Sequence, residues 1–281
     1  MDDGPTVASN VSGVPMSVAW LIALGLISGI GAGLLAGLIG IGGGIVVVPV
    51  IFYGLTVSGV PADAAAHIAV GTSLAAILPA SVVSFLAHWR SGNADIGFLA
   101  KWGPGIAAGV VAAQIAAPHI RGVALSGIFG LLCLIFAVRF AFPDRFRPLF
   151  QRPPDGLLQQ IAGFFVGACS GFAGIGGGIL TNIIMTMTGL PMHKSIGRAA
   201  AVGIVVSLPA TLTAGLASDA FQPLEIGAID LPMLASIAPT QALGAWFGAS
   251  FAPSLSAENL SRIFAGALAV TGAAMLRSAM N

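Results

Sequence analysis

The sequence predicts an all-α polytopic membrane protein with two pseudo-symmetric halves of about five helical segments each, related as inverted repeats. Three observations support this fold class. Hydrophobic residues form 57% of the 281-residue chain and charged residues only 7%, whereas soluble domains carry roughly 25% charged residues. Ten apolar segments flank a single polar linker, and one triple-glycine motif occurs in each half. Because water cannot solvate such a surface, most of it must face lipid.

The apolar segments fall into two sets of five on either side of a basic linker, residues 143–156. In the first repeat, residues 1–142, they lie near 16–39, 45–58, 66–88, 97–117 and 121–142. In the second repeat, residues 157–281, they lie near 157–173, 179–190, 195–218, 229–252 and 259–279. Arg and Lys concentrate in cytoplasmic loops, so the Arg-rich linker is predicted to be cytoplasmic. Five crossings per half then put both termini outside and give the halves opposite topology.

The second segment of each half is short. As helices, residues 45–58 and 179–190 would extend only about 18–21 Å, whereas a full crossing needs roughly 30 Å. Each segment is therefore a half-helix or an irregular span. If each segment re-enters instead of crossing, every half has four crossings and the inverted arrangement fails.

The string GLIGIGGGIVVVP at 37–49 returns as GFAGIGGGILTNI at 171–183. Each glycine in a helix interior costs up to about 1 kcal/mol relative to alanine, so both motifs predict a broken helix. Apolar helices broken at matching points of two halves point to a transporter's binding site. The free amides and dipole of each new helix N-terminus favour an anion there. The predicted anion-binding residues are Gly42, Gly43, Gly44, Ile45, Gly176, Gly177, Gly178 and Ile179. The alternative is close helix packing through small residues.

Prolines and further glycines extend the repeat beyond the two motifs. Aligned pairs are Gly33 with Gly167, Gly37 with Gly171, Pro61 with Pro191, Pro79 with Pro209, Pro104 with Pro239, Gly109 with Gly244, and Pro118 with Pro253. Pro79 and Pro209 are expected to kink their helices at matching depths, which shapes a cavity, a hinge or only the packing.

Several polar side chains within apolar segments are candidate substrate ligands. Thr72 and Ser73 offer hydroxyls to an oxyanion, unless they bond their own backbone carbonyls. Arg198 lies deep enough to face a vestibule and attract an anion, although a long arginine can also extend to the interface. Asn182 replaces Val48 of the first half and is either a ligand or an interhelical contact, as are Gln114 and Gln241.

A second group is a candidate for gating or proton-linked steps. Asp63 and His67 are one helical turn apart near the outer end of the third segment, as a proton relay or as an interface cap. His193 and Lys194 lie at the start of the eighth segment. His193 can titrate near neutral pH, and Lys194 fits the excess of positive charge on the cytoplasmic side.

The composition excludes several classes of function. A net charge of +1 leaves no basic surface for nucleic acid. Cys133 and Cys169 fall in apolar segments and lack the spacing of a disulfide framework or a metal site. The membrane segments contain no paired carboxylates, no HExxH pattern and no GxxxxGK[ST] loop. We therefore expect no enzyme, no built-in ATP hydrolysis, no metal and no cofactor.

The duplicated G-x-x-G-I-G-G-G segment, the AVGTS run at 69–73 and the two apolar halves around a basic loop resemble the sulfite exporter TauE/SafE family, also called the toluene-sulfonate uptake permease group. The resemblance covers nearly the whole chain, and the second half carries AVGIVVS at 201–207 in place of AVGTS. It implies a multi-pass protein of the bacterial inner membrane that moves sulfite, organosulfonates or related small oxyanions in either direction.

The sequence therefore predicts a secondary transporter that moves a small sulfur-containing anion across the cytoplasmic membrane by alternating access. Its expected partners are the small anionic substrate and the lipid bilayer, and a homodimer is compatible with this architecture. An anion channel of the same fold and a transporter of a small carboxylate remain alternatives. An intramembrane enzyme and a membrane assembly scaffold are less consistent with the duplicated motif.

Overall fold

The computed structural model describes residues 18–40, 42–142, 153–216 and 225–280. Within them the chain forms ten α-helices, two short 3₁₀ helices and one two-stranded hairpin. The α-helices of the first half are α1 (Val18–Ile39), α2 (Gly44–Val57), α3 (Ala62–Arg90), α4 (Ile96–Ala116) and α5 (Gly122–Ala141). Those of the second half are α6 (Gly156–Ala173), α7 (Gly178–Met187), α8 (Met192–Gly215), α9 (Leu231–Phe251) and α10 (Ala257–Met280). The predicted all-α membrane fold is confirmed.

Seven of the described helices are long and apolar enough to cross a membrane, and α2 and α7 are shorter apolar helices. At 1.5 Å per residue, the 14 residues of α2 extend about 21 Å and the 10 residues of α7 about 15 Å. Each is shorter by itself than the roughly 30 Å of a full crossing, so the number of crossings per half stays a prediction. Ten residues of the linker, 143–152, lie outside the described residues, so the predicted boundary between the repeats stays a prediction.

Two 3₁₀ helices and one β-hairpin connect some of the described α-helices. The 3₁₀ helices η1 (Ala117–His119) and η3 (Ala252–Ser254) follow α4 and α9. The strands β1 (Glu225–Ile226) and β2 (Ile229–Asp230) pair antiparallel before α9. This hairpin was not predicted, because strands of two residues carry no readable alternation of polar and apolar side chains.

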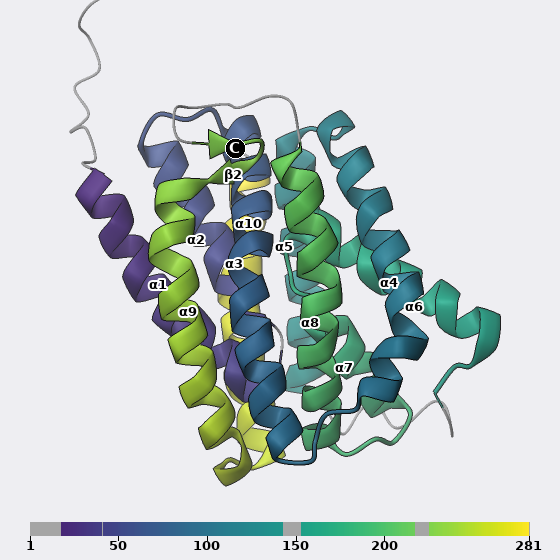
Figure 1. Ribbon diagram of the computed structural model, residues 1–281. Helices are drawn as coiled ribbons and strands as arrows, with labels where there is room; N and C mark the ends of the chain where they lie inside the picture. The colour runs from purple at the N-terminus through teal and green to yellow at the C-terminus, as the bar shows by residue number, and fades with distance from the viewer. Residues whose placement is uncertain (1–17, 41, 143–152, 217–224, 281) are drawn as a thin grey trace, which may run out of the picture.

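Each half packs its first helix on the fourth helix of the other half. Helix α1 runs along α9, and α6 runs along α4. The central contacts join α3 with α8 and α5 with α10 (Figure 1). Each principal helix contact made by the first half therefore has an equivalent contact made by the second half.

Glycines permit the two exchanged contacts. A Cβ atom added at Gly244 of α9 would lie 3.0 Å from the Cα atom of Gly33 in α1. In the other pair, a Cβ atom at Gly167 of α6 would collide with the carbonyl oxygen of Ile106 in α4. Small residues at membrane helix contacts let backbones approach closely, which replaces the hydrophobic driving force that lipid removes. The aligned glycines thus occupy equivalent contacts in the two halves.

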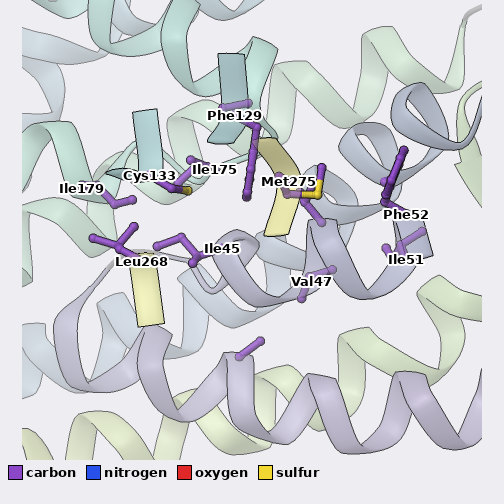
Figure 2. Close-up of a cluster of buried hydrophobic side chains, with 14 of the residues drawn as sticks. Ile45, Val47, Ile51, Phe52, Phe129, Cys133, Ile175, Ile179, Leu268 and Met275 are labelled. Atoms are coloured by element: carbon purple, nitrogen blue, oxygen red, sulfur yellow. The ribbon is translucent and has the colours of Figure 1, made fainter. Parts of the chain in front are cut away.

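The largest buried apolar cluster surrounds the starts of the two short helices. Ile45 of α2 and Ile179 of α7 are each 1% exposed and lie beside Leu268 of α10 and Cys133 of α5 (Figure 2). Dense packing of this kind fixes the position of each half-helix, since even small volume changes in a core are costly. The side chains of Ile45 and Ile179 therefore anchor the helices, and only their backbone amides remain candidates for binding.

Candidate functional site

The two triple-glycine motifs form the breaks that the sequence predicts. Helix α2 begins after Gly43, whose φ is 78°, and α7 begins after Gly177, whose φ is 71°. Other residues reach this left-handed region only at a cost of about 1–2 kcal/mol, so glycine is needed at both turns. Neither helix start has a side-chain cap. Each start therefore relies on other groups to satisfy its first amides.

The two breaks lie in direct contact at the centre of the fold. A Cβ atom added at Gly42 would lie 3.3 Å from the Cα atom of Gly176. A Cβ atom added at Gly44 would lie 3.2 Å from the Cα atom of Ile175 and would collide with the carbonyl oxygen of Gly174. The predicted candidate residues of the two motifs are thus brought together, although they are far apart in the sequence.

The breaks are closely packed in this conformation. A small cavity beside Gly177, lined also by Ser170 and Ile179, holds about 10 Å³. This is about the volume that one water molecule requires. Part of the local backbone is also paired, since Gly177 N donates to the carbonyl of Ile175 over 2.6 Å. Admission of an anion here requires the two breaks to separate.

Polar side chains from each half hold the break of the other half. Ser73 of α3 donates from Oγ to the carbonyl oxygen of Gly174 over 3.0 Å. Gln241 of α9 donates from Nε2 to the carbonyl oxygen of Gly42 over 2.6 Å. Both side chains are fully buried, so these hydrogen bonds form away from water. In this conformation they support the motif backbone.

Thr72 contacts a different partner. It is fully buried, and its Oγ1 accepts a hydrogen bond from the backbone amide of Asp230 over 2.9 Å. Thr72 and Ser73 therefore both bond across to the second half.

Arg198 of α8 lies in a partly exposed position near the loop between α3 and α4. Its Nη2 atom is 3.3 Å from Oδ2 of Asp95, and its guanidinium carbon is 5.0 Å from the centre of the Phe98 ring. Its Nη1 atom is 3.7 Å from the sulfur of Met185 in α7. Stacking on an aromatic ring and pairing with a carboxylate are typical of arginine. The charge is thus available to an anion only if Asp95 releases it.

Asn182 is fully buried in α7, and neither polar atom of its side-chain amide has a hydrogen-bond partner among the described residues. Its backbone carbonyl accepts from Oγ of Ser195 over 3.4 Å, which places it against the start of α8. Arg198 lies one turn further along that helix. An unsatisfied buried amide costs roughly 1–3 kcal/mol, so this position has an unfilled capacity to bind a polar group.

The pair Asp63 and His67 fastens α3 to the turn before α5. Gly122 N donates to Oδ1 of Asp63 over 2.5 Å. The ring nitrogens of His67 lie 2.9 Å from the carbonyl oxygen of Asp63 and 3.1 Å from that of Ala117. These contacts match the expected interface cap, and a proton relay through the pair stays a prediction.

Two residues at the start of α8 complete the predicted set. Lys194 is exposed, which fits a residue at the membrane surface. His193 lies in the first turn of α8, and its side chain is outside the described part of the structure. Their role in gating stays a prediction.

Sequence reasoning missed two residues, Asp95 and Asp230, that the structure places against predicted site residues. Gln241, predicted as a ligand or an interhelical contact, makes an interhelical contact with Gly42. Asp95 precedes α4 in the first half, and Asp230 ends β2 in the second. The two aspartates directly precede α4 and α9, at the same offset that relates Pro104 to Pro239. The matching positions of these two aspartates in the two halves could have identified them from the sequence. Among the described residues, no group of three His, Cys, Asp or Glu side chains could hold a metal ion.

Comparisons with known proteins cover most of the chain. A family model described as sulfite exporter TauE/SafE matches residues 24–275. A probable membrane transporter protein of Haemophilus influenzae is 28% identical over 247 residues, covering 87% of this chain and 94% of the relative. A probable membrane transporter protein of Methanocaldococcus jannaschii is 26% identical over 268 residues, covering 91% and 96%. No solved structure gives a significant match.

Proposed function

Because the chain belongs to the sulfite exporter TauE/SafE family of membrane transporters, we propose that it is a secondary transporter for a small sulfur oxyanion or organosulfonate. Transport proceeds by alternating access across the cytoplasmic membrane. The single observation that carries this proposal is the contact between the two glycine breaks, Gly42 against Gly176 and Gly44 against Gly174. Two helix N-termini that start at one central point provide backbone amides and positive dipole ends for an anion.

The exchange of packing partners supports a pseudo-two-fold relation between the halves, and the opposite directions of corresponding helices support the inverted form of it. Helix α1 contacts α9 as α6 contacts α4, and α3 contacts α8 on the line between the halves. In Figure 1, α10 ends at the same end of the bundle as the β1–β2 hairpin. Ser261, near the start of α10, donates to the carbonyl of Phe140, near the end of α5, so these two helices are antiparallel. Rocking of one repeat against the other around a fixed central site is the usual motion of such folds.

In this proposal each polar residue has a distinct role. Arg198 attracts the anion from the cytoplasmic side and exchanges Asp95 for it. Asn182 supplies an amide on the same side, and Ser73 supplies its hydroxyl when the two breaks separate. The positive dipole ends of α2 and α7 hold the anion at the centre.

The test is flux of labelled anions into proteoliposomes. The substrates are sulfite, thiosulfate, an organosulfonate and a short carboxylate, each at several concentrations. Slow, saturable flux of a sulfur anion supports the carrier. Flux that rises linearly to high concentration indicates a channel, and preference for the carboxylate corrects the substrate class.

The variant Arg198→Ala tests, in the same assay, whether Arg198 is the cation that attracts the anion. Its matched control is Arg262→Ala, since Arg262 is also paired with a carboxylate, Glu258, but has a 70% exposed side chain on α10. Loss of flux in the first variant with normal flux in the second supports the proposal. Normal flux in both variants assigns Arg198 to anchoring the helix end.

A further inference from the structure

The β1–β2 hairpin occupies the space between the two central helices at one end of the bundle. Ile229 is 5% exposed and packs in one cluster with Ala75 of α3 and Ala214 of α8. Ala228 N donates to the carbonyl oxygen of Ala214 over 3.1 Å, and its own carbonyl lies where a Cβ atom of Gly71 would be. Figure 1 places β2 at the end of the bundle where α10 ends. The hairpin therefore closes the gap between α3 and α8 on that side.

Asp230 is the last residue of this hairpin and is 8% exposed. Its backbone amide donates to Oγ1 of Thr72, and its Oδ1 accepts from the amide of Met233 over 2.8 Å. The ion pairs in the described part of the chain are Arg198 with Asp95 and Arg262 with Glu258, so no described cation pairs with Asp230. A buried carboxylate without a cation is costly to keep ionised.

Asp95, which aligns with Asp230 in the first half, is exposed and has a cationic partner. The side chain of Asp95 is 50% exposed and lies 3.3 Å from Nη2 of Arg198. Both aspartates directly precede the fourth helix of their half. The duplication therefore provides one ion-paired carboxylate that faces water and one buried carboxylate that lacks a cation.

The elements packed on Asp230 bring no cation to it. Helix α3 carries Asp63 and His67, whose side chains contact the turn before α5. It also carries His88 and Arg90 in its last turn, at the other end of the helix from Thr72. Helix α9 contains no charged residue. On α8 the charged residues lie near its start, with Arg198 about 25 Å from the end that meets the hairpin, at 1.5 Å per residue. The remaining neighbour is Glu225 of β1, whose side chain lies outside the described part of the structure.

The seated hairpin holds this carboxyl largely out of water at the N-terminus of α9. Burial raises the pKa of the Asp230 carboxyl, and the hydrogen bond from Met233 N lowers it by a smaller amount. The seated state therefore gains stability relative to an exposed state as pH falls through the raised pKa. The gain ends at the ordinary pKa of a solvated aspartate, below which both states are protonated.

We propose that Asp230 is a proton-binding site whose protonation favours the closed position of the hairpin at this end of the transport path. A proton joins a carboxylate oxygen of Asp230 when the hairpin seats between α3 and α8. The same O–H bond breaks, and the proton returns to water, when the hairpin lifts. Proton uptake thus accompanies closure of this end of the transport path. The inference rests on the proposed transport function, and its test uses no transported substrate.

The first measurement is an infrared pH titration of the purified protein in lipid, which follows the carbonyl stretch of protonated carboxyl groups. Wild type should show a band that titrates above the ordinary aspartate range. Asp230→Asn should lack that band. The matched control Asp95→Asn removes the ion-paired counterpart and should keep it.

The second measurement is hydrogen exchange of the peptides that cover residues 225–230. Variants are compared at the same pH, which removes the intrinsic pH dependence of exchange. Wild-type exchange should exceed that of Asp230→Asn several-fold above the titration midpoint and equal it below, because the amide mimics the protonated acid. If Asp230→Asn does not fold, Asp230→Glu replaces it and should shift the band and its midpoint.

The proposal is overturned if the titrating band persists in Asp230→Asn, keeps its position and midpoint in Asp230→Glu, or is absent from wild type. Equal hairpin exchange in wild type and Asp230→Asn at every pH also overturns it. A normal titration in a protein that moves no anion leaves the proton site standing and rejects the transport function. Anion flux in a protein whose Asp230 does not titrate supports the transport function and rejects the proton site.

Discussion

Ser73 donates a hydrogen bond from its side-chain Oγ to the backbone carbonyl of Gly174, so the third helix of the first half holds the broken segment of the second. Gln241 does the same in the opposite direction, from α9 to the carbonyl of Gly42. Glycine-rich turns leave carbonyls outside any helix, and buried carbonyls need a partner. The two halves therefore satisfy the polar groups that each other's breaks expose.

Ser73→Ala should lower the free energy of unfolding by about 1–3 kcal/mol, because it leaves a buried carbonyl without its donor. The control is Ser91→Ala. Ser91 is exposed, and its hydroxyl bonds only the carbonyl of Ala87 in its own helix. Melting temperature in detergent measures both. Equal melting temperatures for the two variants would show that the contact between the halves contributes little stability.

Gly177→Ala should be strongly destabilising, for two reasons that can be separated. The residue has a φ of 71°, and an added Cβ atom would lie 2.7 Å from Val206 Cγ2. Gly189 has a φ of 79° with nothing within 4 Å of such an atom, so Gly189→Ala carries only the backbone cost of about 1–2 kcal/mol. The difference in unfolding free energy between the variants measures the packing at the break.

Anion affinity of the same two variants tests binding at the break. If the amides at the start of α7 contact the anion, Gly177→Ala should weaken binding tenfold or more in protein that still folds, since a hydrogen bond to a charged group contributes about 1.5–3 kcal/mol. Gly189→Ala should bind normally. Normal affinity in both variants, with a lower melting temperature for Gly177→Ala, would assign the motif to packing alone.

Asp95→Asn should strengthen binding of the anion by up to about fivefold, because it frees Arg198 from a partly exposed ion pair worth about 0–1 kcal/mol. The effect should shrink at high ionic strength, where such charges are screened. Titration of the labelled anion at low and high salt measures both trends. Weaker binding in Asp95→Asn would mean that the carboxylate positions the guanidinium instead of competing with the anion.

The inverted topology predicts that the linker and the C-terminus lie on opposite sides of the membrane. In a background without Cys133 and Cys169, we expect Met280→Cys to react with an impermeant maleimide in intact cells. Asp155→Cys should react only after permeabilisation. Both positions are exposed in the structure. Labelling of both from one side would reject five crossings per half.

Most of the fold can be predicted from the sequence, because a segment inside the lipid bilayer must satisfy its own backbone hydrogen bonds. Long apolar segments must be helices, and glycine triplets must interrupt them, so α1 to α10 and both breaks follow from composition and spacing. The hairpin at Glu225–Asp230 could not be predicted in this way, because strands of two residues are too short to show alternating polar and apolar side chains. Its position depends on packing between α3 and α8.

The candidate site was less predictable, because its contacts join residues far apart in the chain. Thr72 and Ser73 are visible as polar residues in an apolar run, but their partners, Asp230 and Gly174, depend on the tertiary fold. The charge of Arg198 is equally visible, whereas its pairing with Asp95 follows from how the loop before α4 meets α8. Alignment of the halves indicates such partners only after the fold is known.

The exchange of packing partners has a consequence for how the chain is made. Helix α1 is synthesised before the other nine described α-helices, whereas its partner α9 is synthesised after α1 to α8. Until α9 is synthesised, the glycine-lined face of α1 contacts only lipid or transient partners. Helix α4 likewise lacks its partner until α6 is synthesised. The first half is therefore an unfinished assembly that depends on the membrane insertion machinery. A truncated product that ends at the linker should be recognised and degraded as an orphan subunit would be.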